Sequence, residues 1–287
     1  MDIKVNKIQL RKNLLTKWDL DNGNYGDYVT SDANGYPISS PWTDNQPWVD
    51  NPIWYYDPSI DGNLPQSGNI EGYWKLDEAR SGTRYDSSLR HNDLYETHDD
   101  LPVGYSAAGV SGNCAVFTNA SIFEGPEWVR YWEYLIREYA NCNGLKGGTG
   151  FSIKLWFNPT DPQTGVGELI GKGGAPPAAP ATYSYYVYWN YTVGTVQFSV
   201  TSDGGVHTST VLSQALTTGA WHEIWCVFDG VNQEMHIYAD GTKNTEVGTI
   251  ASAHNEDFYD LRMGSGYTGK IDQVVFWNKV LTDDDIL

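Results

Sequence analysis

Apolar and polar residues alternate in short runs along most of the chain after about residue 70. In the run Phe151–Phe157 every second residue is apolar, and the runs Thr195–Thr201 and Trp221–Asp229 alternate in a similar way. A period of two is typical of β-strands that bury one face. Asp-Gly pairs begin at Asp229 and Asp240, and this dipeptide favours tight turns between antiparallel strands. The pattern therefore predicts an all-β fold, either a sandwich or a barrel.

One stretch departs from this alternation. Between Pro126 and Tyr139 the apolar residues recur at helical spacing, with a proline near the first turn. We therefore expect one short helix inserted among the strands.

The first 68 residues have a different composition. Prolines recur too often for a helix or a central strand, and tryptophans lie between them. A flexible linker would be rich in Gly and Ser and poor in aromatic residues. We therefore expect residues 1–68 to form an extended, mostly irregular arm, and residues 69–287 to form the β-sandwich. The arm is expected to dock through Trp42, Trp48 and Trp54, either on a partner or on its own sandwich.

Charge and hydropathy exclude several classes of partner. The chain has 36 acidic and 18 basic residues, for a net charge of −18. Nucleic acids and anionic membranes are recognised by basic patches, so neither is expected as a partner. No apolar run is long enough to insert into a membrane, and the N-terminus lacks the apolar core of a secretion signal. The three cysteines have no metal-like spacing and are expected to be buried thiols.

Four motifs in order carry a family resemblance. The segments Gly72–Ser88, Trp221–Gly230, Ile237–Gly241 and Gly269–Ile286 resemble the opening strand, the Trp-led central strand, its hairpin and the closing strand of laminin G-like, concanavalin A-like lectin domains. The resemblance implies an antiparallel jelly-roll sandwich over about residues 70–287. It also implies binding of glycans, proteins or calcium. The N-terminal arm resembles no family.

Calcium follows from the same resemblance. It implies that the loop at Asp86 lies beside the closing strand at Asp272, where acidic residues of relatives hold a structural Ca²⁺. Leu89 stands where the family usually has a glycine. The alternative is that Asp86 caps a turn and Asp272 accepts backbone hydrogen bonds.

The segment Tyr183–Tyr191 is the densest aromatic cluster. Alternate residues of a strand point the same way, so Tyr185, Trp189 and Tyr191 share one face while Tyr186 and Tyr188 share the other. One face is expected to be core, and the pattern does not show which. A strand that is buried on both faces is the alternative. We take Tyr185, Trp189 and Tyr191 as the candidate glycan platform.

No enzyme motif is present. Glycosidases need two carboxyl groups at short separation, and the acidic run Glu256–Asp260 comes nearest without strand alternation. No Gly-x-Ser-x-Gly nucleophile occurs. We therefore expect a non-catalytic adhesion module on a virion surface, present in many copies. Its arm would dock on capsid or tail proteins and its sandwich would bind a host surface polysaccharide. The alternatives are a secreted bacterial carbohydrate-binding module at the cell surface and a glycosidase-like enzyme.

Overall fold

A computed structural model describes residues 64–98, 100–124, 129–138, 142, 144–160, 165–173, 183–202, 208–254 and 260–287. The docking residues expected in the arm, Trp42, Trp48 and Trp54, lie outside the described residues. The division of the chain at residue 68 therefore stays a prediction.

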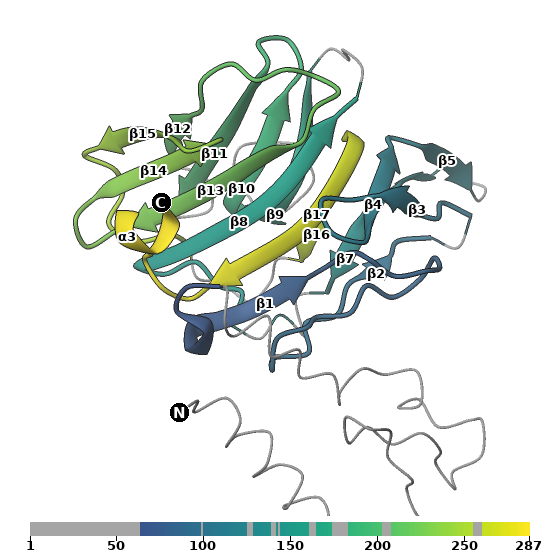
Figure 1. Ribbon diagram of the computed structural model, residues 1–287, viewed down its shortest axis with the longest axis horizontal. Helices are drawn as coiled ribbons and strands as arrows, with labels where there is room; N and C mark the ends of the chain where they lie inside the picture. The colour runs from purple at the N-terminus through teal and green to yellow at the C-terminus, as the bar shows by residue number, and fades with distance from the viewer. Residues whose placement is uncertain are drawn as a thin grey trace, which may run out of the picture. The chain divides into compact units, whose positions relative to one another are not determined.

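Two antiparallel sheets form a sandwich, as the sequence predicts (Figure 1). Within the described ranges, the first sheet has eight strands. Seven run in the order β15 (Thr242–Val247), β14 (Glu234–Ala239), β13 (His222–Asp229), β8 (Gly150–Pro159), β17 (Thr268–Trp277), β4 (Asn113–Thr118) and β3 (Gly104–Ala108), and β1 (Ile70–Trp74) also pairs with β17. In the same ranges the second sheet has the order β12 (Thr208–Leu212), β11 (Thr195–Thr201), β10 (Tyr183–Asn190), β9 (Val166–Gly173), β16 (Leu261–Met263), β7 (Leu135–Arg137) and β2 (Tyr95–Glu96).

The main core lies between the two sheets. The ring of Phe151 on β8 stacks on Phe276 of β17 at a centroid distance of 5.5 Å and lies 4.9 Å from the ring of Tyr185 on β10. All three side chains are buried, so residues from both sheets interdigitate here. Full burial of such side chains stabilises the fold by about 1.5–3 kcal/mol each.

A second apolar cluster covers the opposite face of the first sheet. It includes Tyr73, Trp225, Tyr238 and Trp277, and Leu64 packs against it from the segment before β1. The indole nitrogen of Trp277 donates a 2.8 Å hydrogen bond to the carbonyl of Pro65.

A short helix near the C-terminus, α3 (Asp283–Ile286), begins with a capping box between Thr282 and Asp285. The first sheet is therefore covered on both faces.

The prediction of a helix at Pro126–Tyr139 is wrong. This stretch contains strand β6 (Val129–Trp132), which pairs with β5 (Ser121–Glu124), and strand β7, which pairs with β16 and β2. Aromatic and β-branched residues fit strands well, and pairing with existing strands overrides a helical spacing in so short a segment. The buried carboxylate of Glu133 accepts hydrogen bonds from Thr118 and Ala120, which fixes the turn between β6 and β7.

Two other expectations are confirmed. Asp240 and Gly241 both have positive φ, at 48° and 78°, and connect β14 to β15 as a tight turn. All three cysteines are buried free thiols. No helix among the described residues has the length and apolar character needed to cross a membrane.

Candidate functional site

The three residues of the aromatic platform expected from the sequence lie on the core side of the second sheet, so they do not form an exposed platform. Tyr185 and Trp189 are fully buried in the core between the sheets, and Tyr191 is 8% exposed. Trp189 packs on Phe157 of the opposite sheet, with ring centroids 5.5 Å apart. These three side chains cannot stack on a ligand, because the first sheet already covers them.

The other face of β10 points away from the core and carries the remaining tyrosines. A register shift between Tyr183 and Tyr185 puts Tyr183 on the same side as Tyr186, and their ring centroids lie 4.2 Å apart. Tyr183 and Tyr188 are half-buried, whereas Tyr186 is nearly covered. Burial is the largest influence on the Tyr188 hydroxyl and raises its pKa, while a hydrogen bond with Gln197 lowers it in part.

A ladder of polar side chains continues from these tyrosines across the sheet. Gln197 lies opposite Tyr188, and its amide donates a 3.0 Å hydrogen bond to Ser199 Oγ. Ser199 Oγ and Thr210 Oγ1 share a further hydrogen bond of 2.9 Å. The surface formed by Tyr183, Tyr186, Tyr188, Gln197, Ser199 and Thr210 is called the tyrosine face below.

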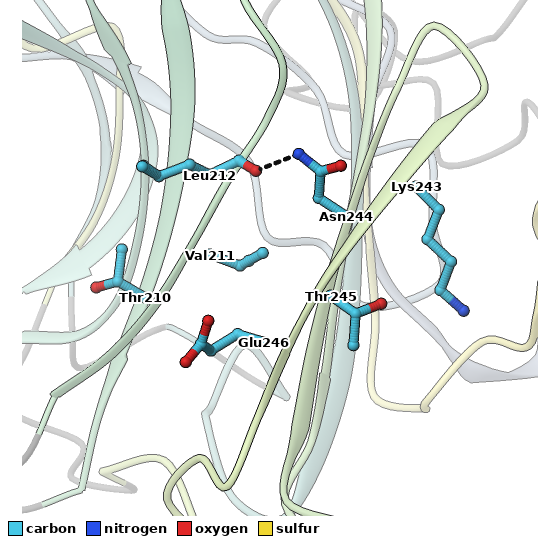
Figure 2. Close-up of a pocket in the computed structure, with 7 residues that line it drawn as sticks. All are labelled: Thr210, Val211, Leu212, Lys243, Asn244, Thr245 and Glu246. Carbon is cyan, nitrogen blue, oxygen red and sulfur yellow. Dashed lines mark hydrogen bonds between the residues drawn. The ribbon is translucent and has the colours of Figure 1, made fainter.

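Thr210 also lines a groove at the edge of the sandwich. The groove has a volume of about 620 Å³ and lies between the edge strands β12 and β15 (Figure 2). Asn244 bridges the two strands by donating a 2.8 Å hydrogen bond to the carbonyl of Leu212. The ammonium of Lys243 lies 2.6 Å from an oxygen of Asp283, while Glu246 is exposed beside the groove. The tyrosine face therefore leads into a polar cleft.

A second set of polar side chains lies on the same side of the second sheet. Glu168 on β9 is 2% exposed, and neither of its carboxyl oxygens has a hydrogen-bond partner among the described residues. Burial raises the pKa of Glu168 to about 8, and the positive charge of Arg262 offsets part of that rise. The Cζ atom of Arg262 on β16 lies 5.4 Å from the ring centroid of Tyr134. Within the described part of the chain, its Nε and Nη1 atoms also have no hydrogen-bond partner.

The predicted calcium ligand Asp86 is fully used in hydrogen bonding. One carboxyl oxygen accepts bonds of 2.8 Å from the backbone of Tyr73 and Ser88, and the other accepts from the Ser88 hydroxyl and the Asn92 backbone. Four donors occupy the lone pairs of one carboxylate. This arrangement matches the alternative in which Asp86 caps a turn.

Asp272 has a different set of partners. Its Oδ2 accepts hydrogen bonds from the backbone of Val110 and Ser111, at 2.6 and 3.3 Å, whereas Oδ1 has no hydrogen-bond partner in the part of the chain that the structure describes. Burial, the largest influence, raises its pKa to about 6, and the nearby Asp77 contributes to the rise. No group of three acidic, histidine or cysteine side chains in the described ranges is arranged to hold a metal.

Sequence inspection missed Glu168 and Arg262. The available signal for Glu168 was one acidic residue between Gly167 and Leu169 in an otherwise apolar run. Arg262 had no signal of its own, because its role depends on the pairing of β16 with β9. The sequence placed Tyr186 and Tyr188 together on one face of their strand, but it did not show which of the two faces lies in the core.

The sequence matches the model of one known protein family. A family model for the concanavalin A-like lectin/glucanases superfamily matches residues 138–287, which is more than half of the chain. No curated protein sequence matches the chain significantly.

Solved structures show the same fold at low sequence identity. The binding domain of botulinum neurotoxin DC in complex with SialylT has a TM-score of 0.53 and 11% identity, covering 77% of this chain and 50% of that one. A mutant of Trypanosoma rangeli sialidase displaying trans-sialidase activity has a TM-score of 0.53 and 12% identity, covering 82% of this chain and 36% of that one. This chain thus spans half or less of each of these neighbours.

Proposed function

Since the chain belongs to the concanavalin A-like lectin/glucanases superfamily, we propose that it is a non-catalytic carbohydrate-binding module whose ligand contacts the tyrosine face. The observation that carries this proposal is the pair of half-buried tyrosines, Tyr183 and Tyr188, beside a ladder of hydrogen-bonded amide and hydroxyl groups. Gln197 and Thr210 are the partly exposed members of this ladder, and Ser199 is buried between them. Tyrosine rings present an apolar face to sugar C–H groups, and the ladder supplies donors and acceptors for sugar hydroxyls.

A fold neighbour supports the ligand class. The botulinum neurotoxin DC binding domain was solved in complex with SialylT. Thr210 belongs both to the tyrosine face and to the groove between β12 and β15, so we expect a polysaccharide ligand to extend from the one into the other.

The biological setting belongs to the same proposal. A shallow site of this kind binds with a dissociation constant of about 1 mM to 1 µM. Display in many copies raises the effective affinity by roughly 10²–10⁴. We place the protein on a virion surface, with its N-terminal arm on capsid or tail proteins and its sandwich on a host polysaccharide. Capsid or tail genes beside the gene for this protein would support this setting, whereas a secretion locus would favour the alternative of a secreted bacterial adhesion module.

A glycan array probed with a multimerised full-length chain tests the proposal. We expect binding to surface polysaccharides, and we expect Tyr188→Ala to reduce it at least tenfold. Tyr105→Ala is the matched control, because Tyr105 lies on β3 of the first sheet and is also partly exposed. No binding by the wild-type chain, or equal losses in both variants, contradicts the proposal. Release of reducing ends from a bound glycan favours the glycosidase alternative.

A further inference from the structure

Two ionisable side chains on the second sheet have buried polar atoms without hydrogen-bond partners among the described residues. Glu168 is 2% exposed, and neither carboxyl oxygen has such a partner. Arg262 is partly buried, and its Nε and Nη1 atoms are buried without one. Buried polar groups are almost always hydrogen-bonded, and an unsatisfied one costs free energy. A residue that persists despite this cost marks a site where something else supplies the hydrogen bonds.

The sheet register brings these groups together beside the tyrosine face. Gly171 on β9 pairs with Tyr186 on one side and with Arg262 on the other. A side chain at Gly171 would collide with the Tyr186 ring and with Glu168 Oε1, so both lie against this glycine. The Glu168 carboxyl group thus lies in the row between Tyr186 and Arg262.

The chemistry of this row selects a class of ligand. A sugar hydroxyl donates one hydrogen bond and accepts others, so it can bond to a carboxyl oxygen and to a guanidinium N–H at once. Arg262 has a second carboxylate nearby, with 3.9 Å between its Nη2 and Asp260 Oδ2. Because the pKa of Glu168 is about 8, its carboxyl group is mostly protonated at pH 7, and Asp260 offsets the positive charge of Arg262. The site therefore has no excess positive charge to attract an anionic ligand, and the net charge of −18 disfavours one further.

We propose that Glu168 and Arg262 form a specificity subsite for a neutral sugar unit, with sugar hydroxyls donating to Glu168 and accepting from Arg262. The subsite rests on the proposed carbohydrate-binding function. Tyr134 beneath the guanidinium holds Arg262 in place through a cation–π contact.

The test compares the full-length wild-type chain with Glu168→Leu and Arg262→Met on an array of neutral and sialylated oligosaccharides. Wild type should prefer neutral glycans, and each variant should lose at least tenfold of its affinity for them. Removal of an unpartnered buried carboxyl should also leave the melting temperature of Glu168→Leu equal to or above that of wild type.

The outcomes separate this inference from the broader function. One outcome is that the wild-type chain binds glycans, that Tyr188→Ala abolishes this binding, and that Glu168→Leu and Arg262→Met bind like wild type. This outcome contradicts the proposed subsite and supports glycan binding by the tyrosine face. A lower melting temperature with unchanged binding in both variants shows a structural pair bridged by water, which also overturns the subsite. A wild-type preference for sialylated glycans overturns the neutral class. Glu168→Gln provides a second variant if the leucine variant does not fold.

Discussion

The indole ring of Trp277 stacks on that of Trp225, with centroids 5.5 Å apart, on the face of the first sheet that points away from the main core. Trp277 is fully buried, and the Nζ atom of Lys154 lies 4.9 Å from the centroid of the Trp225 ring. The backbone of Pro65 accepts the indole hydrogen bond of Trp277. The segment before β1 is therefore anchored to the closing strand.

Removal of this anchor should cost stability. Trp277→Ala leaves a cavity and an unpaired carbonyl, and we expect a loss of about 3–5 kcal/mol in the free energy of unfolding. Urea unfolding followed by fluorescence measures the change. Val231→Ala is the control, because Val231 is 78% exposed and its truncation should cost less than about 0.5 kcal/mol. Similar losses in the two variants would contradict the role of the second cluster.

Tyr188 and Trp189 are adjacent in the chain, but their replacement by alanine should affect different properties of the protein. Trp189→Ala removes a fully buried ring, so we expect a stability loss of about 3–5 kcal/mol. Tyr188→Ala removes a half-buried ring and should cost less stability while reducing glycan binding. Thermal melts and array binding of both variants provide the comparison. A folded Trp189→Ala protein with normal stability and no binding would restore the platform expected from the sequence.

Glu168 should make stability depend on pH. Burial raises its pKa from 4.5 to about 8 in the folded state, and the positive charge of Arg262 offsets part of that rise. The Tyr134 hydroxyl also lies close enough to be influenced by Glu168. The folded state therefore holds this proton more tightly than the unfolded state. The contribution of the protonated Glu168 to the free energy of unfolding is fully present below about pH 4.5. It is lost as pH rises toward 8, at up to about 1.4 kcal/mol per pH unit. Urea unfolding from pH 5 to 8 should show a steeper decline in wild type than in Glu168→Gln. Parallel curves would contradict the raised pKa.

Calcium binding at Asp86 and Asp272 stays a prediction that thermal melts can decide. Four hydrogen bonds already occupy the Asp86 carboxylate, so we expect the same melting temperature with EDTA and with added calcium. Asp272→Asn should behave identically in the two solutions. A calcium-dependent rise in wild type that is absent in Asp272→Asn would establish the ion, because a ligand stabilises the state that binds it.

The N-terminal arm can be tested by limited proteolysis of the full-length chain. We expect rapid cleavage that stops before Leu64, since Leu64 and Pro65 contact the second cluster. Mass spectrometry of the remaining fragment identifies the boundary. Resistance of the whole chain would show that the arm docks on its own sandwich, and the capsid or tail partner would lose its main support.

The sequence by itself determined the class of fold and several details of it. The alternation in Phe151–Phe157 predicted a strand, and its alternate apolar residues do share the main core, because side chains of a strand point to opposite sides in turn. The Asp240–Gly241 pair predicted a tight turn, because these residues tolerate positive φ. Both features depend on local geometry, which is encoded in neighbouring residues.

Only the tertiary structure decided where the candidate site lies. Both faces of β10 are aromatic, so the choice between Trp189 and Tyr188 depended on which face met the first sheet. The strands at Pro126–Tyr139 depended on pairing with distant segments, which outweighed a helical spacing. Glu168 and Arg262 became one set only because β16 pairs with β9. Such contacts join residues far apart in the chain, and no local pattern records them.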